Sequence, residues 1–153
     1  VLNITDRDEV YQFAWEAGTT SEGVGIQQDD FVAVGYGAQG CAVISYRVQP
    51  DGSLQGLWGV YGHNTTGTEQ AVRTDSPTPG IAGAYNITGT NMDGSAYRGK
   101  LTITPRGDAY QFVWEAGDTF RGIGIQTVIS SRLGMGMMKP VWLRLMNFNP
   151  MVS

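Results

Sequence analysis

The chain has few of the residues on which catalysis and metal binding most often depend. Its 153 residues include one cysteine, Cys41, and one histidine, His63. A single cysteine cannot form a disulfide bond within the chain, and one histidine with one cysteine falls short of the four ligands of a structural zinc site. Catalysis by a serine or cysteine with a histidine base would have to use His63, which the surrounding turn residues place in an exposed loop. We therefore expect no enzymatic activity, no metal site and no cofactor.

Charge and long apolar runs are also scarce. Lysine and arginine number 10, aspartate and glutamate number 14, and the net charge is −4 with no basic cluster. This balance disfavours binding to the phosphate backbone of a nucleic acid. No apolar stretch approaches the roughly 20 residues that a membrane-spanning helix needs. The expected partner is therefore a small molecule or a protein.

Glycine is abundant, at 22 positions, and it separates short runs in which apolar and polar residues alternate. Tyr11–Glu16 is one such run, with the aromatic residues on one face of a strand and the polar ones on the other. Asp51-Gly52 lies between two further runs and predicts a tight hairpin turn, because the glycine readily adopts a positive φ. No helical period is present. The sequence therefore predicts an all-β, antiparallel protein.

One stretch of the chain returns after 99 residues. Tyr11–Gly18 matches Tyr110–Gly117, and 16 of 27 positions are identical when residues 1–27 are aligned with residues 100–126. Such a match indicates duplication. We divide the chain into a first repeat over residues 1–74 that lacks its N-terminal strand or strands, a linker over 75–80, and the N-terminal part of a second repeat over 81–127.

Combining the two copies predicts a unit of eight strands. Ile81–Thr90 and Tyr97–Thr104 would provide the first two strands, and six more are expected between Tyr11 and Arg73. An up-and-down meander of eight strands is typical of a small calycin-like barrel, and an open sandwich is the alternative. Because both repeats are incomplete, we also expect a hybrid barrel that joins early strands of the second copy to later strands of the first.

The last part of the chain, residues 128–153, departs from the repeat and is rich in methionine. A shifted reading frame explains this departure. One extra G before the Val128 codon, with suitable codons, converts residues 127–136 into TGDFIAVGYG, against QDDFVAVGYG at residues 28–37. The final glycine is forced, because the single codon of Met135 followed by GG of Gly136 reads GGG. We therefore predict that 128–153 is a frameshifted, non-native tail; a divergent methionine-rich element is the alternative.

Aromatic residues expected on the inner faces of the strands are the only candidates for a ligand site. They are Tyr11, Phe13, Trp15, Trp58, Tyr85 and Tyr97. A cavity lined by such residues could hold a small ligand, although packing alone would also place them inside. The neighbouring pairs Trp15-Glu16 and Trp114-Glu115 predict a core indole and a solvent carboxylate on opposite faces of a strand rather than a catalytic pair.

Glycine and aromatic residues recur in a fixed pattern, which includes Gly83-x-Tyr85-x-Ile87-x-Gly89, Asp93-Gly94-Ser95-x-Tyr97-x-Gly99, Ala33–Gly37 and Asp51-Gly52-x-Leu54-x-Gly56-x-Trp58. This pattern resembles a largely uncharacterised family of small bacterial proteins, some of whose members are labelled fibronectin-binding. The resemblance implies repeated lipocalin- or avidin-like β-barrel modules without catalytic residues. We expect a non-enzymatic binding module; the alternatives are a carrier of a small apolar ligand and a surface adhesin for a host or matrix protein.

Overall fold

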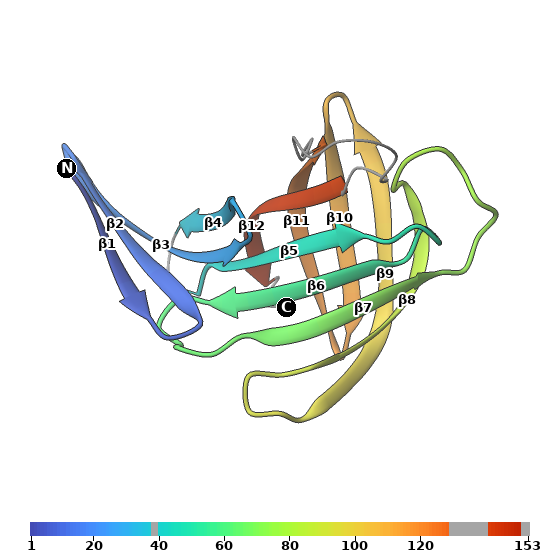
Figure 1. Ribbon diagram of the computed structural model, residues 1–153, viewed down its shortest axis with the longest axis horizontal. Helices are drawn as coiled ribbons and strands as arrows, with labels where there is room; N and C mark the ends of the chain where they lie inside the picture. The colour runs from blue at the N-terminus through green and yellow to red at the C-terminus, as the bar shows by residue number, and fades with distance from the viewer. Residues whose placement is uncertain (38–39, 129–140, 151–153) are drawn as a thin grey trace.

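The structure is a computed structural model that describes residues 1–37, 40–128 and 141–150. Within these residues the chain forms strands and no helix, as the sequence predicted (Figure 1). All pairings between strands are antiparallel. The strands are β1 (Leu2–Arg7), β2 (Val10–Ala17), β3 (Thr19–Gln28), β4 (Phe31–Gly37), β5 (Ala42–Val48), β6 (Leu54–Val60), β7 (Gly67–Arg73), β8 (Gly83–Thr90), β9 (Ala96–Arg106), β10 (Ala109–Ala116), β11 (Asp118–Val128) and β12 (Val141–Pro150).

The hairpins between strands are closed by the turn residues that the sequence marks. Gly52 has a φ of +81° in the turn before β6, and the Ser53 backbone N–H donates to Asp51 Oδ1 at 2.9 Å. Asp93-Gly94-Ser95 repeats this turn before β9, with the Ser95 N–H again 2.9 Å from the aspartate oxygen. Both aspartates therefore shape hairpins, and the hairpin at Asp51-Gly52 was predicted from the sequence.

Seven strands, β5 to β11, form one strongly curled antiparallel sheet, which we call the curled sheet. Each strand in it pairs with the next along the chain. The remaining strand, β12, pairs with β11 on one side and with β5 on the other, so the pairings run in a ring. The strand β7, from residues 1–74, pairs directly with β8, which follows the predicted linker.

The first four strands form a separate sheet, the N-terminal sheet, in the order β1-β2-β3-β4. In Figure 1 β1 to β3 extend to one side of the curled sheet. The expectation that the strands after Tyr11 continue the eight-stranded unit was therefore wrong for β2, β3 and β4, whose places β10, β11 and β12 take. A two-residue turn, Gly107-Asp108, connects β9 to β10. Pairing across such a short loop loses little chain entropy, which favours β10 as the neighbour of β9.

Two apolar clusters hold the sheets together. The inner core lies on the concave side of the curled sheet and comprises Ile44, Tyr46, Leu54, Ala71, Ile81, Tyr85, Ile87, Leu101, Ile103, Phe112 and Trp114. The outer core joins the N-terminal sheet to the other face of β5 and comprises Val10, Val24, Ile26, Ala33, Cys41 and Val43. Alternation along β5 explains the division, because Ile44 and Val43 point to opposite sides of the same strand.

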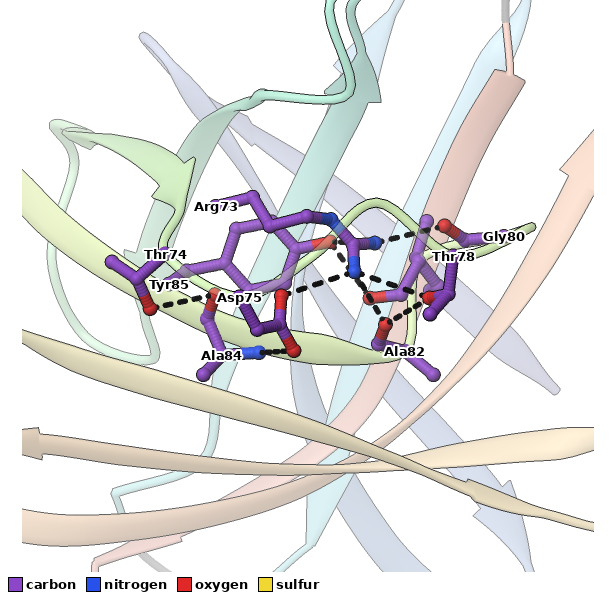
Figure 2. Close-up of polar contacts among 9 residues, drawn as sticks. Arg73, Thr74, Asp75, Thr78, Gly80, Ala82, Ala84 and Tyr85 are labelled. Atoms are coloured by element: carbon purple, nitrogen blue, oxygen red, sulfur yellow. Dashed lines mark hydrogen bonds and ion pairs between the residues drawn. The ribbon is translucent and has the colours of Figure 1, made fainter.

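The connection between β7 and β8, which includes the predicted linker, is fixed by Arg73 (Figure 2). Its guanidinium donates to the carbonyl oxygens of Gly80 at 3.0 Å and Ala82 at 2.8 Å, and to Tyr85 Oη at 2.9 Å. It also pairs with Asp75 at 3.3 Å and lies over the Tyr85 ring, 5.1 Å from the centroid. These contacts hold the two strands and Tyr85 in place at one end of the inner core.

Candidate functional site

A buried carboxylate, Glu69, lies on the concave side of the curled sheet. The strand β7 alternates between buried Gly67, Glu69 and Ala71 and exposed Thr68 and Gln70. Because side chains alternate along a strand, Glu69 points into the interior with Gly67 and Ala71, and it is 5% exposed. Burial of an ionisable group is costly unless it forms hydrogen bonds or pairs with a charge. Its surroundings therefore define the candidate site.

Three aromatic side chains from three other strands donate hydrogen bonds to Glu69. Tyr46 on β5 donates its hydroxyl to Oε1 in a short bond, and Tyr97 on β9 donates its hydroxyl to Oε2 at 2.7 Å. The indole Nε1 of Trp114 on β10 lies 3.1 Å from Oε1 and 3.1 Å from Tyr46 Oη. Both carboxylate oxygens thus accept at least one bond, and the side chain has a fixed position.

The electrostatics of the site follow from burial. Burial raises the pKa of Glu69, and the hydrogen bonds from Tyr46, Tyr97 and Trp114 partly oppose that rise. Burial also raises the pKa of both tyrosines, and the nearby Glu69 charge adds to that effect, so both remain protonated donors. Neither ion pair identified among the described residues involves Glu69. When ionised, the carboxylate is therefore a negative charge without a cationic partner among the residues that the structure describes.

Glu69 borders a cavity of about 360 Å³ inside the curled sheet. Its wall is mainly apolar, with aromatic rings from Trp58, Tyr97, Trp114 and Phe120. Among the described residues the buried Nε1 atom of Trp58 has no hydrogen-bond partner of normal geometry, although it lies close enough to Tyr97 to lower the pKa of that hydroxyl. A larger, more open depression of about 540 Å³ also reaches Glu69, but its wall consists mostly of glutamine, threonine and glycine. We take the inner cavity as the candidate site because it is the less open of the two and combines aromatic walls with one carboxylate among its described lining residues.

The six aromatic residues chosen from the sequence divide into two groups. Tyr85 is 1% exposed within the inner core, and Trp58 and Tyr97 pack against that core. Trp58 and Tyr97 also line the cavity, whereas Tyr85 lies at the end tied by Arg73.

The other three, Tyr11, Phe13 and Trp15, lie on β2 in the N-terminal sheet and are not part of the inner core. In their place the second copy supplies Tyr110, Phe112 and Trp114. The structure therefore brings Trp58 and Tyr97 together and leaves the three residues of β2 apart from them.

Sequence reasoning missed the centre of the site. Glu69 and Tyr46 were not among the candidates. A signal for Glu69 is present in the sequence, because it shares one face of a strand with Gly67 and Ala71. If those small residues are assigned to the inner face, the glutamate between them is on the inner face too. Trp114 was identified only as a core residue, which is correct, since it is 2% exposed while Glu115 is exposed on the opposite face.

The other residues with chemical potential lie away from this cavity. His63 is exposed in the loop after β6, as predicted. Cys41 is buried in the outer core, and burial raises the pKa of its thiol. Over the described ranges there is no group of three or more His, Cys, Asp or Glu side chains that could hold a metal ion. In the same ranges no helix is long and apolar enough to cross a membrane.

Comparison with protein-family models, with curated proteins and with solved structures finds no match to this chain.

Proposed function

We propose that this chain is a non-enzymatic binding module in which a closed, eight-stranded, calycin-like barrel holds a small amine against Glu69. The ring of strand pairings supports the barrel, since each strand from β5 to β12 has two neighbours in it. Eight strands suit an interior that holds side chains and one small ligand. The observation that carries the function is a buried carboxylate that has no cationic partner among the described residues and lies at the wall of a partly enclosed cavity.

The size and lining of the cavity favour a ligand over simple packing. About 360 Å³ lies within the range of cavities that bind small molecules. A core that served packing alone would gain nothing from Glu69, because a buried carboxylate loses its hydration even when hydrogen-bonded. The three donors that fix Glu69 hold it ready to receive a ligand rather than leaving it free to reorient.

The chemistry of the wall favours an ammonium group on the ligand. An ammonium close to Glu69 would supply the missing positive charge, and a charge-assisted hydrogen bond would follow. The aromatic rings of Trp58, Trp114 and Phe120 would surround the cation and the apolar body attached to it, since aromatic faces attract cations. A ligand with a compact ammonium and an aromatic or aliphatic body therefore fits best.

The composition of the wall also supports binding without catalysis. Glu69 is the only carboxylic acid among the described residues that line the cavity, and neither His63 nor Cys41 lies there. Hydrolysis by a pair of carboxylates needs a second acid facing the first. Among the described residues that line the cavity there is also no serine, threonine, cysteine or lysine to act as a nucleophile beside Glu69.

Benzylamine and benzyl alcohol form a matched pair of probes, because both have the same ring and methylene group. We expect the protein to bind benzylamine roughly tenfold to a hundredfold more tightly, which corresponds to one hydrogen bond between charged groups. Isothermal titration calorimetry measures both affinities. Glu69→Gln should remove the preference for the amine, and Glu115→Gln, on the outer face of β10, should leave it unchanged.

The pH dependence provides a second readout of the same site. Because binding needs the ionised carboxylate, affinity for benzylamine should fall as the pH decreases through the raised pKa of Glu69. Equal affinities for the amine and the alcohol in the unaltered protein would contradict the proposed ligand class. An unchanged preference for the amine in Glu69→Gln would show that another group binds the ammonium.

A further inference from the structure

The strand β1 exposes side chains whose counterparts in the second repeat are fully buried. Leu2 is 47% exposed and Ile4 is 55% exposed. The equivalent residues 99 positions later, Leu101 and Ile103 on β9, are 0% and 2% exposed in the inner core. The apolar face of β1 lies in solvent, whereas the same face of its equivalent, β9, lies in the inner core. The position of β9 would therefore bury the exposed face of β1.

That position is the edge of β8. In the structure β8 pairs with β9 through Tyr85 opposite Leu101 and Ala84 opposite Thr102. Moving this register back by 99 residues places Leu2 opposite Tyr85 and Asn3 opposite Ala84. The strand β1 pairs with β2, and no other described strand pairs with it. Its second edge is therefore open for β8.

The remaining strands follow the same correspondence. By the repeat, β2 is equivalent to β10 and β3 to β11, and each pair has the same hairpin register, with Tyr11 opposite Gly25 and Tyr110 opposite Gly124. In chain order β4 lies between β3 and β5, which is the place that β12 occupies between β11 and β5 in the ring. The pairing of β12 is irregular on both sides, with register shifts against β11 and against β5.

We infer that β1–β4 and β9–β12 are interchangeable partners of the half-barrel β5–β8, so that one chain forms two alternative rings. The observed ring has the order β8-β9-β10-β11-β12-β5-β6-β7, and the second has β1-β2-β3-β4 in place of β9-β10-β11-β12. The occupant of the open edge and inner face of β1–β4 is thus β5–β8 of the same molecule. In the second ring Leu2 and Ile4 are buried, and β4 leads directly into β5.

The exchange changes the interior in a defined way. Glu69 and Tyr46 belong to the shared half and stay in both rings. Trp15 takes the position of Trp114, because the two tryptophans are equivalent in the repeat, and it supplies the indole that faces Glu69. Tyr97 belongs to β9 and leaves the interior with that strand, so its bond to Glu69 is specific to the observed ring.

Three cysteines report which ring is present. The variant carries Asn3→Cys, Ala84→Cys and Thr102→Cys in a Cys41→Ala background, and it is equilibrated in a glutathione redox buffer. A disulfide between positions 84 and 102 reports the observed ring, and one between positions 3 and 84 reports the second. A disulfide between positions 3 and 102 fits neither ring and measures unfolded chain. Peptide mapping by mass spectrometry of the monomer fraction quantifies all three.

Two matched substitutions in this variant bias the exchange in opposite directions. We expect both reporting disulfides in the parent. Leu101→Asp should raise the ratio of the 3–84 to the 84–102 disulfide by about tenfold or more, and Leu2→Asp should lower it by a similar factor, because each charge would be buried in only one ring. The inference is overturned if the 84–102 disulfide is the only reporter in all three proteins, if Leu101→Asp yields mainly the 3–102 disulfide, or if the 3–84 disulfide occurs only in dimers.

Discussion

The two copies of the repeat have the same local structure and different surroundings. Phe13 stacks on Trp15 with ring centroids 5.5 Å apart, and Phe112 stacks on Trp114 at 5.4 Å, with nearly equal angles between the ring planes. Yet Trp114 is 2% exposed and bonded to Glu69, whereas Trp15 is half-buried at the face of the N-terminal sheet, with its ring near Tyr36.

The opposite faces of the same strands show the reverse pattern. Val24 and Ile26 on β3 are 0% and 1% exposed in the outer core. Their equivalents on β11, Ile123 and Ile125, are 58% and 41% exposed. One copy therefore buries the face that the other exposes. Gly59 on β6 allows the close contact in the first copy, since a Cβ there would lie 3.1 Å from Val10 Cγ1, tighter than most such contacts.

This contrast shows that the repeat specifies strands and hairpins but leaves the choice of buried face to the neighbours. Both faces of each strand contain apolar residues, so either one gains free energy when it is covered. The second copy has β8 beside it and closes over the inner core. The first copy packs against the outside of β5 instead.

The largest expected effect is the difference between the two tryptophans. Trp114→Ala should lower the free energy of unfolding by about 3–5 kcal/mol, because it leaves a cavity in the inner core and removes a donor to Glu69. Trp15→Ala should cost about 1 kcal/mol, since the ring is only half-buried. Urea unfolding followed by far-UV circular dichroism measures both. Equal losses would contradict the difference in burial between the two tryptophans. A larger loss for Trp15→Ala would indicate that the second ring dominates.

A smaller difference is expected on the outer face, where the substitution in the first copy should cost more than the one in the second. Ile26→Ala should lower the free energy of unfolding by about 2–4 kcal/mol, because the side chain is buried between the two sheets. Ile125→Ala should change it by no more than about 0.5 kcal/mol, as is usual for an exposed position. The same urea titrations compare the pair. A loss of similar size at Ile125 would show that the exposed face of β11 is covered in solution.

Much of the local structure could be predicted from the sequence. Alternation and glycine turns predicted antiparallel strands, and Asp51-Gly52 correctly predicted a hairpin. The arrangement of β2 to β4 could not be predicted in this way, because Tyr11–Glu16 and its repeat have nearly the same sequence, and only tertiary neighbours decide which of them joins the curled sheet. Glu69 was within reach of the alternation rule, but its meaning depends on Tyr46 and Trp114, which lie far from it in the chain.

Two carboxyl groups extend the comparison to pH. Burial raises the pKa of Glu69 in the curled sheet above the usual 4.5 of a glutamate. Glu9, in the turn of the N-terminal sheet, accepts bonds from the Thr66 N–H at 2.7 Å and hydroxyl at 2.9 Å, which lower its pKa from the same value. The two groups therefore make stability depend on pH with opposite signs.

The smallest expected effects are changes in how steeply stability varies with pH when these two groups are substituted. Stability from Glu69 is present below about pH 4.5 and is lost as the pH rises through its raised pKa; stability from Glu9 is present above about pH 4.5 and is lost as the pH falls through its lowered pKa. In thermal unfolding measured from pH 3 to pH 8, Glu69→Gln should reduce the fall of the melting temperature as the pH rises toward neutral. Glu9→Gln should weaken only the acid-side decline, and less strongly, because the carboxylate is exposed. If Glu9→Gln leaves that decline unchanged, the bond from Glu9 to Thr66 does not help to hold the N-terminal sheet against the loop after β6.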